Sequence, residues 1–267
     1  MASDGGETLT VITGASSGIG AALAAHVARP GMAVGLVGRN PDGLAATASA
    51  VSAAGGIPLI GRYDVTDPAM AEWMAEASAQ RRLHAVYANA GVSAGPPSPG
   101  ALETASDTER LVAANLLGAI ATVRAAATVM RTQPERPLRR IGVVSSIAGV
   151  FPLADLAVYG ATKAAVRQYA HAIRPRMKGW GITISVVCPG FVTSAMSARH
   201  HGIKPFEMPA DRAARIMVRA VERGQRTCIF PLPFALLAAL QPLGPGWLID
   251  AITPMFSAEI APDPRER

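Results

Sequence analysis

The sequence contains very little cysteine: among its 267 residues only Cys188 and Cys228 carry a thiol. Their separation matches no common metal-ligand spacing, and two thiols cannot build a disulfide framework. We therefore expect reduced thiols in a cytoplasmic protein without a metal site, with Cys188 a small buried residue. The adjacent His200 and His201 would need further ligands to hold a metal, so a solvated loop is the favoured interpretation of both.

A targeting segment and a membrane span are also lacking. Residues 1–7 carry neither a basic nor an apolar run, so we expect no secretory signal. The most membrane-like stretch, residues 228–249, is free of charge but is broken by prolines, which argues against a spanning helix. Lys and Arg outnumber Asp and Glu by 25 to 19, yet no basic run is interleaved with aromatic residues. We expect no nucleic-acid partner, and a mildly basic surface would instead attract an anionic cofactor.

Short β-branched runs alternate with longer helical patterns along the chain, which indicates an α/β fold. With half of its residues hydrophobic, the chain has ample material for a core. We predict a doubly wound parallel sheet of the Rossmann type with about seven strands and helices on both faces. No linker or repeat is visible, so one domain, residues 1–267, is expected. The predicted strands are Leu9–Thr13, Ala33–Val37, Ile57–Tyr63, Ala85–Ala88, Ile141–Ser145, Thr183–Cys188 and Thr227–Phe230, and the long predicted helices include Ser106–Met130 and Tyr159–Lys178.

Three segments depart from this alternation. Residues 95–100 form a Pro/Gly loop, and residues 133–140 form a polar connection. Met196–Pro209 is a long irregular insertion after a strand end, where the ligand site of an α/β sheet usually lies. We expect a lid loop over about residues 194–210.

The first strand runs into a glycine-rich turn, Gly14-Ala15-Ser16-Ser17-Gly18-Ile19-Gly20, which is followed by a helix. Glycine permits a tight turn and a close approach of the backbone to a pyrophosphate, which then sits at the helix N-terminus. A glycine-rich turn without a ligand is the competing interpretation. The position directly after the first strand favours a dinucleotide site.

The end of the second predicted strand reads Val37-Gly38-Arg39-Asn40 and has no acid. A dehydrogenase that prefers NAD(H) would place Asp or Glu there to bind the ribose 2′-hydroxyl. The planar guanidinium of Arg39 suits a 2′-phosphate instead. NADP(H) is therefore favoured over NAD(H), although Arg39 as a plain surface residue is the alternative.

Tyr159 and Lys163 lie one helical turn apart on the same face of a predicted helix. A phenol has a pKa near 10, and a nearby ammonium together with a cationic nicotinamide would lower that pKa. Tyr159 could then give a proton to a carbonyl or take one from an alcohol. Ser146 precedes the pair at the end of a strand, where its hydroxyl could hold a developing oxyanion. A Tyr-x3-Lys pair is common by itself and can be a plain surface pair. The wider pattern of motifs is therefore needed to identify it as catalytic.

Taken together, these motifs resemble the short-chain dehydrogenase/reductase family over about residues 8–195. The resemblance implies a catalytic tetrad of Asn115, Ser146, Tyr159 and Lys163, in which Asn115 holds a water that links Lys163 to solvent. It also implies that Asp64-Val65 binds adenine and that the segment from Pro189 holds the nicotinamide carboxamide, with Ser194 where the family often has threonine. The implied cofactor-binding residues are Gly14, Ser16, Ser17, Gly18, Ile19, Gly20, Arg39, Asp64, Val65, Asn89, Ala90, Gly91, Tyr159, Lys163, Pro189, Gly190, Val192 and Ser194.

The C-terminal part departs from the family pattern. Many members end in a strand and a Val-Asp-Gly-Gly tail that builds a tetramer, whereas this chain has an apolar extension over about residues 229–267. That extension could pack on the domain, form a dimer interface, act as a lid or touch a membrane surface. We expect a homodimer or other homo-oligomer and an apolar ketone or alcohol substrate. The expected function is NADP(H)-dependent hydride transfer between a carbonyl and a secondary alcohol; the alternative is a non-catalytic NADP(H)-binding regulator or scaffold.

Overall fold

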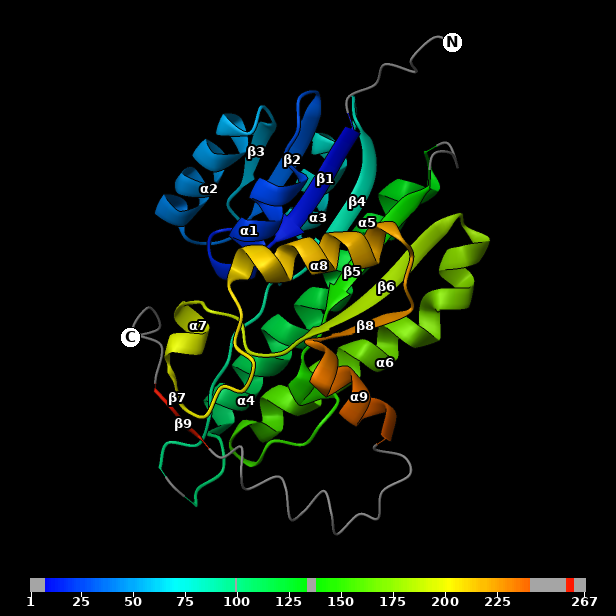
Figure 1. The fold of residues 1–267 in the computed structure, drawn as a ribbon. Coiled ribbons are helices and arrows are strands. Elements are labelled where there is room, and N and C mark those ends of the chain that lie inside the picture. Colours follow the sequence, from blue (N-terminus) through cyan, green and yellow to red (C-terminus); the bar gives the residue numbers. More distant parts are fainter. Residues whose placement is uncertain (1–7, 99, 134–137, 241–257, 262–267) are drawn as a thin grey trace.

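The centre of the molecule is a parallel sheet of seven strands in the order β3-β2-β1-β4-β5-β6-β8 (Figure 1). This computed structural model describes residues 8–98, 100–133, 138–240 and 258–261. The strand order reverses between β1 and β4, so the predicted doubly wound parallel sheet is confirmed. The strands are β1 Thr8–Thr13, β2 Met32–Val37, β3 Ile57–Gly61, β4 Arg82–Ala88, β5 Arg139–Val144, β6 Ile182–Pro189 and β8 Thr227–Phe230.

Helices cover both faces of the sheet (Figure 1). One layer contains α1 (Gly18–Val27), α2 (Pro41–Ala53) and α8 (Ala210–Glu222), with α1 packed between the other two. The opposite layer contains α3 (Ala69–Ala77), α5 (Gly118–Arg131) and α6 (Ala157–Gly179). Each layer buries its own apolar cluster against the sheet, because strands covered on both faces must be apolar on both. The carboxyl ends of the strands stay uncovered by these layers and are available for a site.

Some element ends differ by one or two residues from the sequence prediction. The strand predicted over Ile57–Tyr63 ends at Gly61, and the helix predicted to begin at Tyr159 begins at Ala157. Helix ends are set by capping and tertiary contacts that apolar periodicity does not report.

The helix predicted over Ser106–Met130 is confirmed as an unbroken helical stretch, Ala105–Arg131, but its middle contains a π turn that the sequence did not predict. The structure has α4 (Ala105–Leu111), then a π-helical segment η1 (Val112–Leu117), then α5. A π turn inserts an extra residue into the helical ladder and is often found at functional sites. Asn115, the proposed tetrad member, lies inside this segment and is completely buried.

The segment expected to be an irregular lid contains regular structure. It holds a short helix α7 (Ala195–Ala198) and a strand β7 (His200–Gly202), which pairs antiparallel with β9 (Ala258–Ile260) from the C-terminal extension. Figure 1 shows β7 and β9 side by side, away from the central sheet. The prediction that His200 is solvated is therefore wrong: pairing with β9 leaves its side chain only 7% exposed, whereas His201 stays exposed.

The rest of the extension is described in part. Helix α9 (Leu232–Leu240) buries Phe234 and exposes four leucines. Residues 241–257 and 262–267 lie outside the described residues, so the predicted roles of the extension as an interface or a membrane contact stay predictions. The thiol of Cys188 is fully buried, as predicted, and both cysteines are free.

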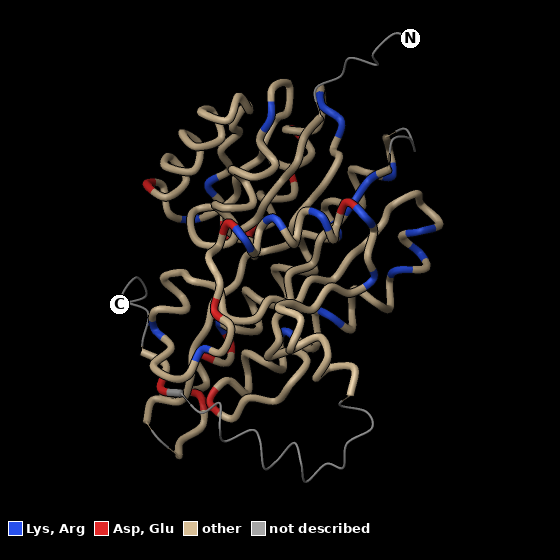
Figure 2. Tube along the Cα trace, viewed as in Figure 1, with Lys and Arg blue, Asp and Glu red and all other residues tan. Residues whose placement is uncertain are grey.

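Within the described residues, the stretch Ala105–Arg131 is long and apolar enough to cross a membrane by length and composition alone. Its α5 part buries Val123, Ala126 and Met130 in the core and packs against α3 and β4. A core helix of this kind is apolar because it is buried in the protein, so this stretch is weak evidence for a membrane span. Figure 2 shows Lys and Arg positions distributed over several elements, with none on α9.

Candidate active site

A cavity of about 740 Å³ opens at the carboxyl ends of the central strands, where the strand order reverses. Such a volume is within the range of about 300–1,000 Å³ that is usual for cofactor and ligand sites. Its lining contains every cofactor-binding residue expected from the sequence, together with Ser146, Tyr159 and Lys163. Asn115 is not in the lining and lies behind it, within the π-helical segment.

The glycine-rich turn forms one wall of the cavity. Gly14 and Gly18 have φ of +69° and +55°, a left-handed backbone that favours glycine. A Cβ on Gly20 would lie 2.0 Å from the carbonyl oxygen of Gly14, so a side chain is excluded there. The turn therefore presents bare backbone to the cavity.

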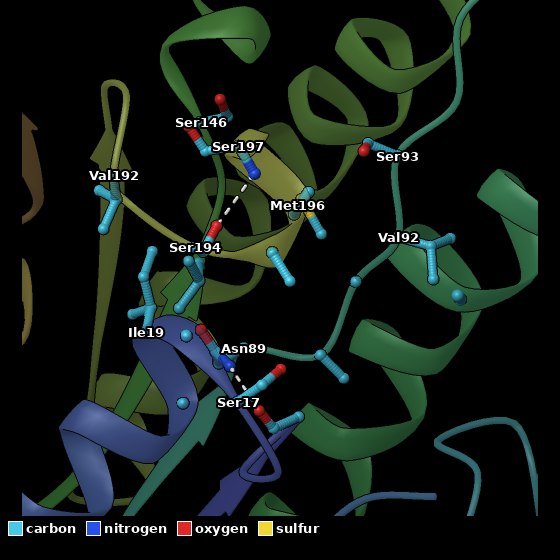
Figure 3. Close-up of a pocket in the computed structure, with 18 of the residues that line it drawn as sticks. Ser17, Ile19, Asn89, Val92, Ser93, Ser146, Val192, Ser194, Met196 and Ser197 are labelled. Atoms are coloured by element: carbon cyan, nitrogen blue, oxygen red, sulfur yellow. Dashed lines mark hydrogen bonds between the residues drawn. The ribbon is translucent and has the colours of Figure 1, made fainter. Parts of the chain in front are cut away.

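The N-terminus of helix α1 faces the same space. Ser17 is its N-cap, but the Ser17 side chain makes no capping hydrogen bond, so the first amides of the helix have no side-chain acceptor. Amides at a helix N-terminus attract phosphate oxygens. Figure 3 shows Ser17 and Ile19 at this end of the pocket, near Asn89. The residues present thus fit the pyrophosphate of a dinucleotide.

Thr13, at the end of β1, holds the turn after β4 against the glycine-rich turn. Its hydroxyl oxygen accepts hydrogen bonds from the backbone N–H groups of Asn89 and Ala90, each at 3.1 Å. The Asn89 side chain donates to the Thr13 carbonyl at 2.9 Å. The turn after β4 is therefore tied to the turn after β1, and both line the cavity.

Arg39 lies at the end of β2 with its side chain 62% exposed. One guanidinium nitrogen is 3.4 Å from the Asp64 carboxylate, and Asp64 also accepts hydrogen bonds from the N–H and hydroxyl of Thr66. An exposed pair of this kind contributes little stability, so an anionic ligand can compete for the guanidinium. Ser16 lies nearby, with its hydroxyl oxygen 3.4 Å from the position of a Cβ on Gly38.

Ser146, Tyr159 and Lys163 meet where β5 and α6 adjoin. Ser146 is the N-cap of the short helix η2 (Ile147–Gly149), and its hydroxyl oxygen accepts from the Ala148 N–H at 3.1 Å. Ser146 also lies close enough to the Tyr159 side chain to favour the ionised phenol. The Lys163 ammonium lies 5.8 Å from the centre of the Tyr159 ring.

Burial shifts the proton affinities at this site. It raises the pKa of Tyr159 above its ordinary 10, and the nearby Ser146 side chain opposes that rise. Burial lowers the pKa of Lys163 to about 8. The lowering of the Tyr159 pKa is predicted for Lys163 acting together with a cationic nicotinamide; among the protein's own groups, burial has the largest influence and acts in the opposite direction. A phenol of this kind is a proton donor at neutral pH.

Two further hydrogen bonds hold Lys163 in place. Its ammonium donates to the Val144 carbonyl at 3.2 Å, and its own carbonyl accepts from the Ser145 hydroxyl at 2.8 Å. Gly91 packs so closely that a Cβ there would lie 3.2 Å from the Lys163 nitrogen. Ser145 was missed at the sequence level, since a serine beside the expected Ser146 carries no separate signal.

The carboxamide of Asn115 is fully engaged with protein groups. Its oxygen accepts from the Val92 N–H at 2.8 Å, and its nitrogen donates to the Val92 carbonyl at 3.0 Å and to the Thr162 hydroxyl at 3.2 Å. Thr162 in turn donates to the Tyr159 carbonyl at 2.7 Å. The side chain of Asn115 therefore joins the turn after β4 to α6.

The segment after β6 completes the cavity. Pro189, Gly190 and Val192 line it, and Ser194 caps α7 by accepting from the Ser197 N–H at 3.1 Å. Figure 3 shows Ser194 above Ile19, and a Cβ on Gly18 would lie 3.3 Å from the Ser194 Cβ. The start of the lid thus rests directly on the glycine-rich turn.

The far end of the cavity contains further residues from four separate segments of the chain. These residues are Ser93, Leu153, Leu156, Met196, His200 and Ile260. Met196 and His200 belong to the predicted lid loop and Ile260 to the C-terminal extension, whereas sequence reasoning did not assign the other three to the site.

Comparison with known proteins agrees with this geometry. Residues 8–202 match the family model described as short chain dehydrogenase. An uncharacterized oxidoreductase of Myxococcus xanthus is 32% identical over 90% of this chain and 94% of its own length. The rhamnolipids biosynthesis 3-oxoacyl-[acyl-carrier-protein] reductase of Pseudomonas aeruginosa is 30% identical over 79% of this chain and 82% of its own length.

A solved structure is similar as well. The short-chain dehydrogenase from Sphingobium yanoikuyae in complex with NADPH superimposes with a TM-score of 0.72 at 26% identity, covering 88% of this chain and 94% of that one. Some other curated relatives are longer, and the chain spans 63% of one and 39% of another.

Proposed function

The chain belongs to the short-chain dehydrogenase/reductase family of oxidoreductases, and from that membership we propose that it transfers a hydride between NADP(H) and a carbonyl/secondary alcohol pair. The observation that carries the proposal is the contact of Tyr159 with Ser146 in the cavity, beside the buried ammonium of Lys163. When bound, the nicotinamide would supply or accept the hydride.

The protein groups would handle the proton. Tyr159, whose pKa burial raises, would donate its hydroxyl proton to the carbonyl oxygen in the reducing direction. The Ser146 hydroxyl would orient that oxygen and stabilise its developing charge. Lys163, which lines the cavity, would bind the anionic cofactor and, while charged, would ease the loss of the Tyr159 proton in the oxidising direction. With both polar atoms of its carboxamide bound to protein, the Asn115 side chain would position α6.

The first test is Tyr159→Phe, which removes the proton donor and retains the ring. We expect turnover of a ketone to fall at least ~100-fold, the usual contribution of a general acid, while NADPH binding measured by fluorescence persists. Unchanged turnover would contradict the assignment. If the wild type binds NADPH but oxidises it with no ketone in a graded panel, and reduces NADP⁺ with none of the matching alcohols, the scaffold alternative is supported.

The cofactor proposal rests on Arg39. It lines the cavity at the end of β2, where the sequence Val37-Gly38-Arg39-Asn40 carries no acid, and Ser16 lies on the same side. A guanidinium and a hydroxyl there suit a 2′-phosphate. Replacing Arg39 with Asp should raise the KM for NADPH at least tenfold while leaving or lowering the KM for NADH. Equal changes in the two would refute the NADP(H) preference.

The substrate class is proposed from the apolar far end of the cavity. Leu153, Leu156, Met196 and Ile260 line it, so an apolar ketone or alcohol is favoured. The 3-oxoacyl reductase among the relatives supports an acyl-chain substrate. The homo-oligomeric state and cytoplasmic location stay predictions.

A further inference from the structure

The C-terminal strand β9 is joined to three segments that line the cavity. It pairs with β7, so that His200 lies opposite Ile260. It also contacts η3 (Ala154–Leu156), the short helix just before α6. The third connection runs through Arg199 to Ser93, in the loop after β4.

Arg199 makes this third connection with both its backbone and its side chain. Its carbonyl accepts from the Ala261 N–H at 2.8 Å. Its guanidinium donates to the Ala261 carbonyl at 3.2 Å, to the Ser93 hydroxyl at 3.0 Å and to the Ser93 carbonyl at 3.3 Å. Hydrogen bonds from a charged donor are stronger than neutral ones, so β9 has a defined position relative to the cavity.

Within β9, successive side chains face opposite sides, as in any strand. Ile260 is 9% exposed and lines the cavity, while its neighbour Glu259 is exposed. Gly95 provides the space for Ile260: a Cβ on Gly95 would lie 2.6 Å from the Ile260 Cγ1. Ile260 is therefore closely packed on its outer side and free to meet a ligand on its inner side.

The part of the cavity lining around Ile260 lies on the same side as Ser146. Figure 3 shows Met196 and Ser93 on the side of Ser146, away from Ser17 and Asn89 at the pyrophosphate end. Leu153 and Leu156 precede α6, which carries Tyr159. A substrate carbonyl held at Ser146 would therefore extend its remaining groups toward this part of the lining.

We propose that Ile260 is a specificity-determining residue, which the C-terminal strand places so that it limits the length of hydrocarbon that a substrate can extend beyond its reacting carbonyl. This inference rests on the proposed carbonyl reductase activity and deepens it. The substrate class is a ketone with an unbranched apolar chain, because Leu153, Leu156 and Met196 share this end of the lining with Ile260, beside the polar Ser93 and His200. Nothing in β9 itself carries out chemistry.

The test compares full-length wild type with Ile260→Trp, Ile260→Ala and Glu259→Ala, using NADPH and a series of straight-chain 2-alkanones. The larger Trp side chain should lower kcat/KM for the longest accepted ketone at least tenfold and leave the shortest within twofold. A hydrophobic pocket discriminates by roughly tenfold or more for one misplaced methylene. Ile260→Ala should shift the optimum toward longer chains. Glu259→Ala, on the exposed face of the same strand, should leave the profile unchanged.

Two further measurements separate the possible failures. NADPH affinity should be the same in all four proteins, which shows that the cofactor end is intact. Binding of straight-chain 1-alkanols to the NADP⁺-saturated proteins is measured by the rise in melting temperature. It tests the lining around Ile260 without turnover. If wild type reduces ketones but neither Ile260 variant changes chain-length preference, the specificity proposal is wrong and the proposed function stands. If wild type reduces no ketone, the proposed function fails. A preference for alkanol length that shifts in the Ile260 variants would still support the proposal that Ile260 limits the length of the bound chain.

Discussion

Raising the pH should weaken the binding of NADPH, because it removes the positive charge of Lys163. This side chain is 4% exposed and donates one hydrogen bond, to the Val144 carbonyl. Burial lowers its pKa from 10.5 to about 8. At about 1.4 kcal/mol for each unit of pKa, burial disfavours the ammonium by about 3 kcal/mol. Its charge is therefore lost within a pH range accessible to assay.

The size of the effect follows from the titration. Above pH 8 the charged fraction of Lys163 falls about tenfold for each pH unit. The value of kcat/KM for NADPH reports ionisations of the cofactor-free enzyme, so it should fall by about the same factor between pH 8.5 and 9.5. Burial raises the pKa of Tyr159 above 10 and that of Cys188 to about 11, so neither group should lose its proton in this range.

The assay measures initial rates at limiting NADPH and saturating ketone across this range, at constant ionic strength. The NADPH dissociation constant is followed in parallel by fluorescence. Lys163→Met is the comparison: it should bind NADPH weakly, with an affinity that does not change between pH 7 and 9.5. A wild-type profile that stays flat to pH 9.5, or a Lys163→Met variant with the same pH-dependent affinity as wild type, would refute the reasoning.

Two other predictions concern packing around the site. Gly91→Ala would place a Cβ 2.9 Å from the Asn115 amide oxygen, so ketone turnover should fall at least tenfold. Gly179→Ala is the control: its Cβ would have no neighbouring atom within 4 Å, so turnover should stay unchanged. Asn115→Ala removes the partner of both backbone groups of Val92, which are part-buried. It should lower the free energy of unfolding by up to about 3 kcal/mol for each group left unpaired. In urea titrations this loss should exceed that of Asn40→Ala, an exposed N-cap worth about 1 kcal/mol; an equal loss would argue against the role of Asn115.

Much of the fold could be predicted from the sequence because it depends on local patterns. Apolar β-branched runs mark buried strands, and strand–helix alternation leads to a parallel sheet covered on both faces. The glycine-rich turn from Gly14 to Gly20 could be placed for the same reason, since its backbone geometry excludes side chains. These features need no knowledge of distant residues.

The π turn around Asn115 could not be predicted. The apolar pattern over residues 106–130 is compatible with an unbroken helix, and nothing local requires a π turn. In the folded chain, the Asn115 side chain bonds to Val92 and Thr162, which come from other parts of the sequence. The contribution of burial to the pKa of Tyr159 could not be predicted for a related reason, since the degree of burial is a property of the assembled site.

The sequence alone determined the reaction machinery of this protein: the turn after β1, Arg39 after β2, and the Ser146, Tyr159 and Lys163 group. Each is recognisable from short spacings on one strand end or one helix face. Only the tertiary structure decided the substrate end, where Ser93, Met196 and Ile260 come together. Strand β9 pairs with β7 across more than fifty intervening residues, and backbone pairing between short strands at that separation leaves no signature in local composition or periodicity.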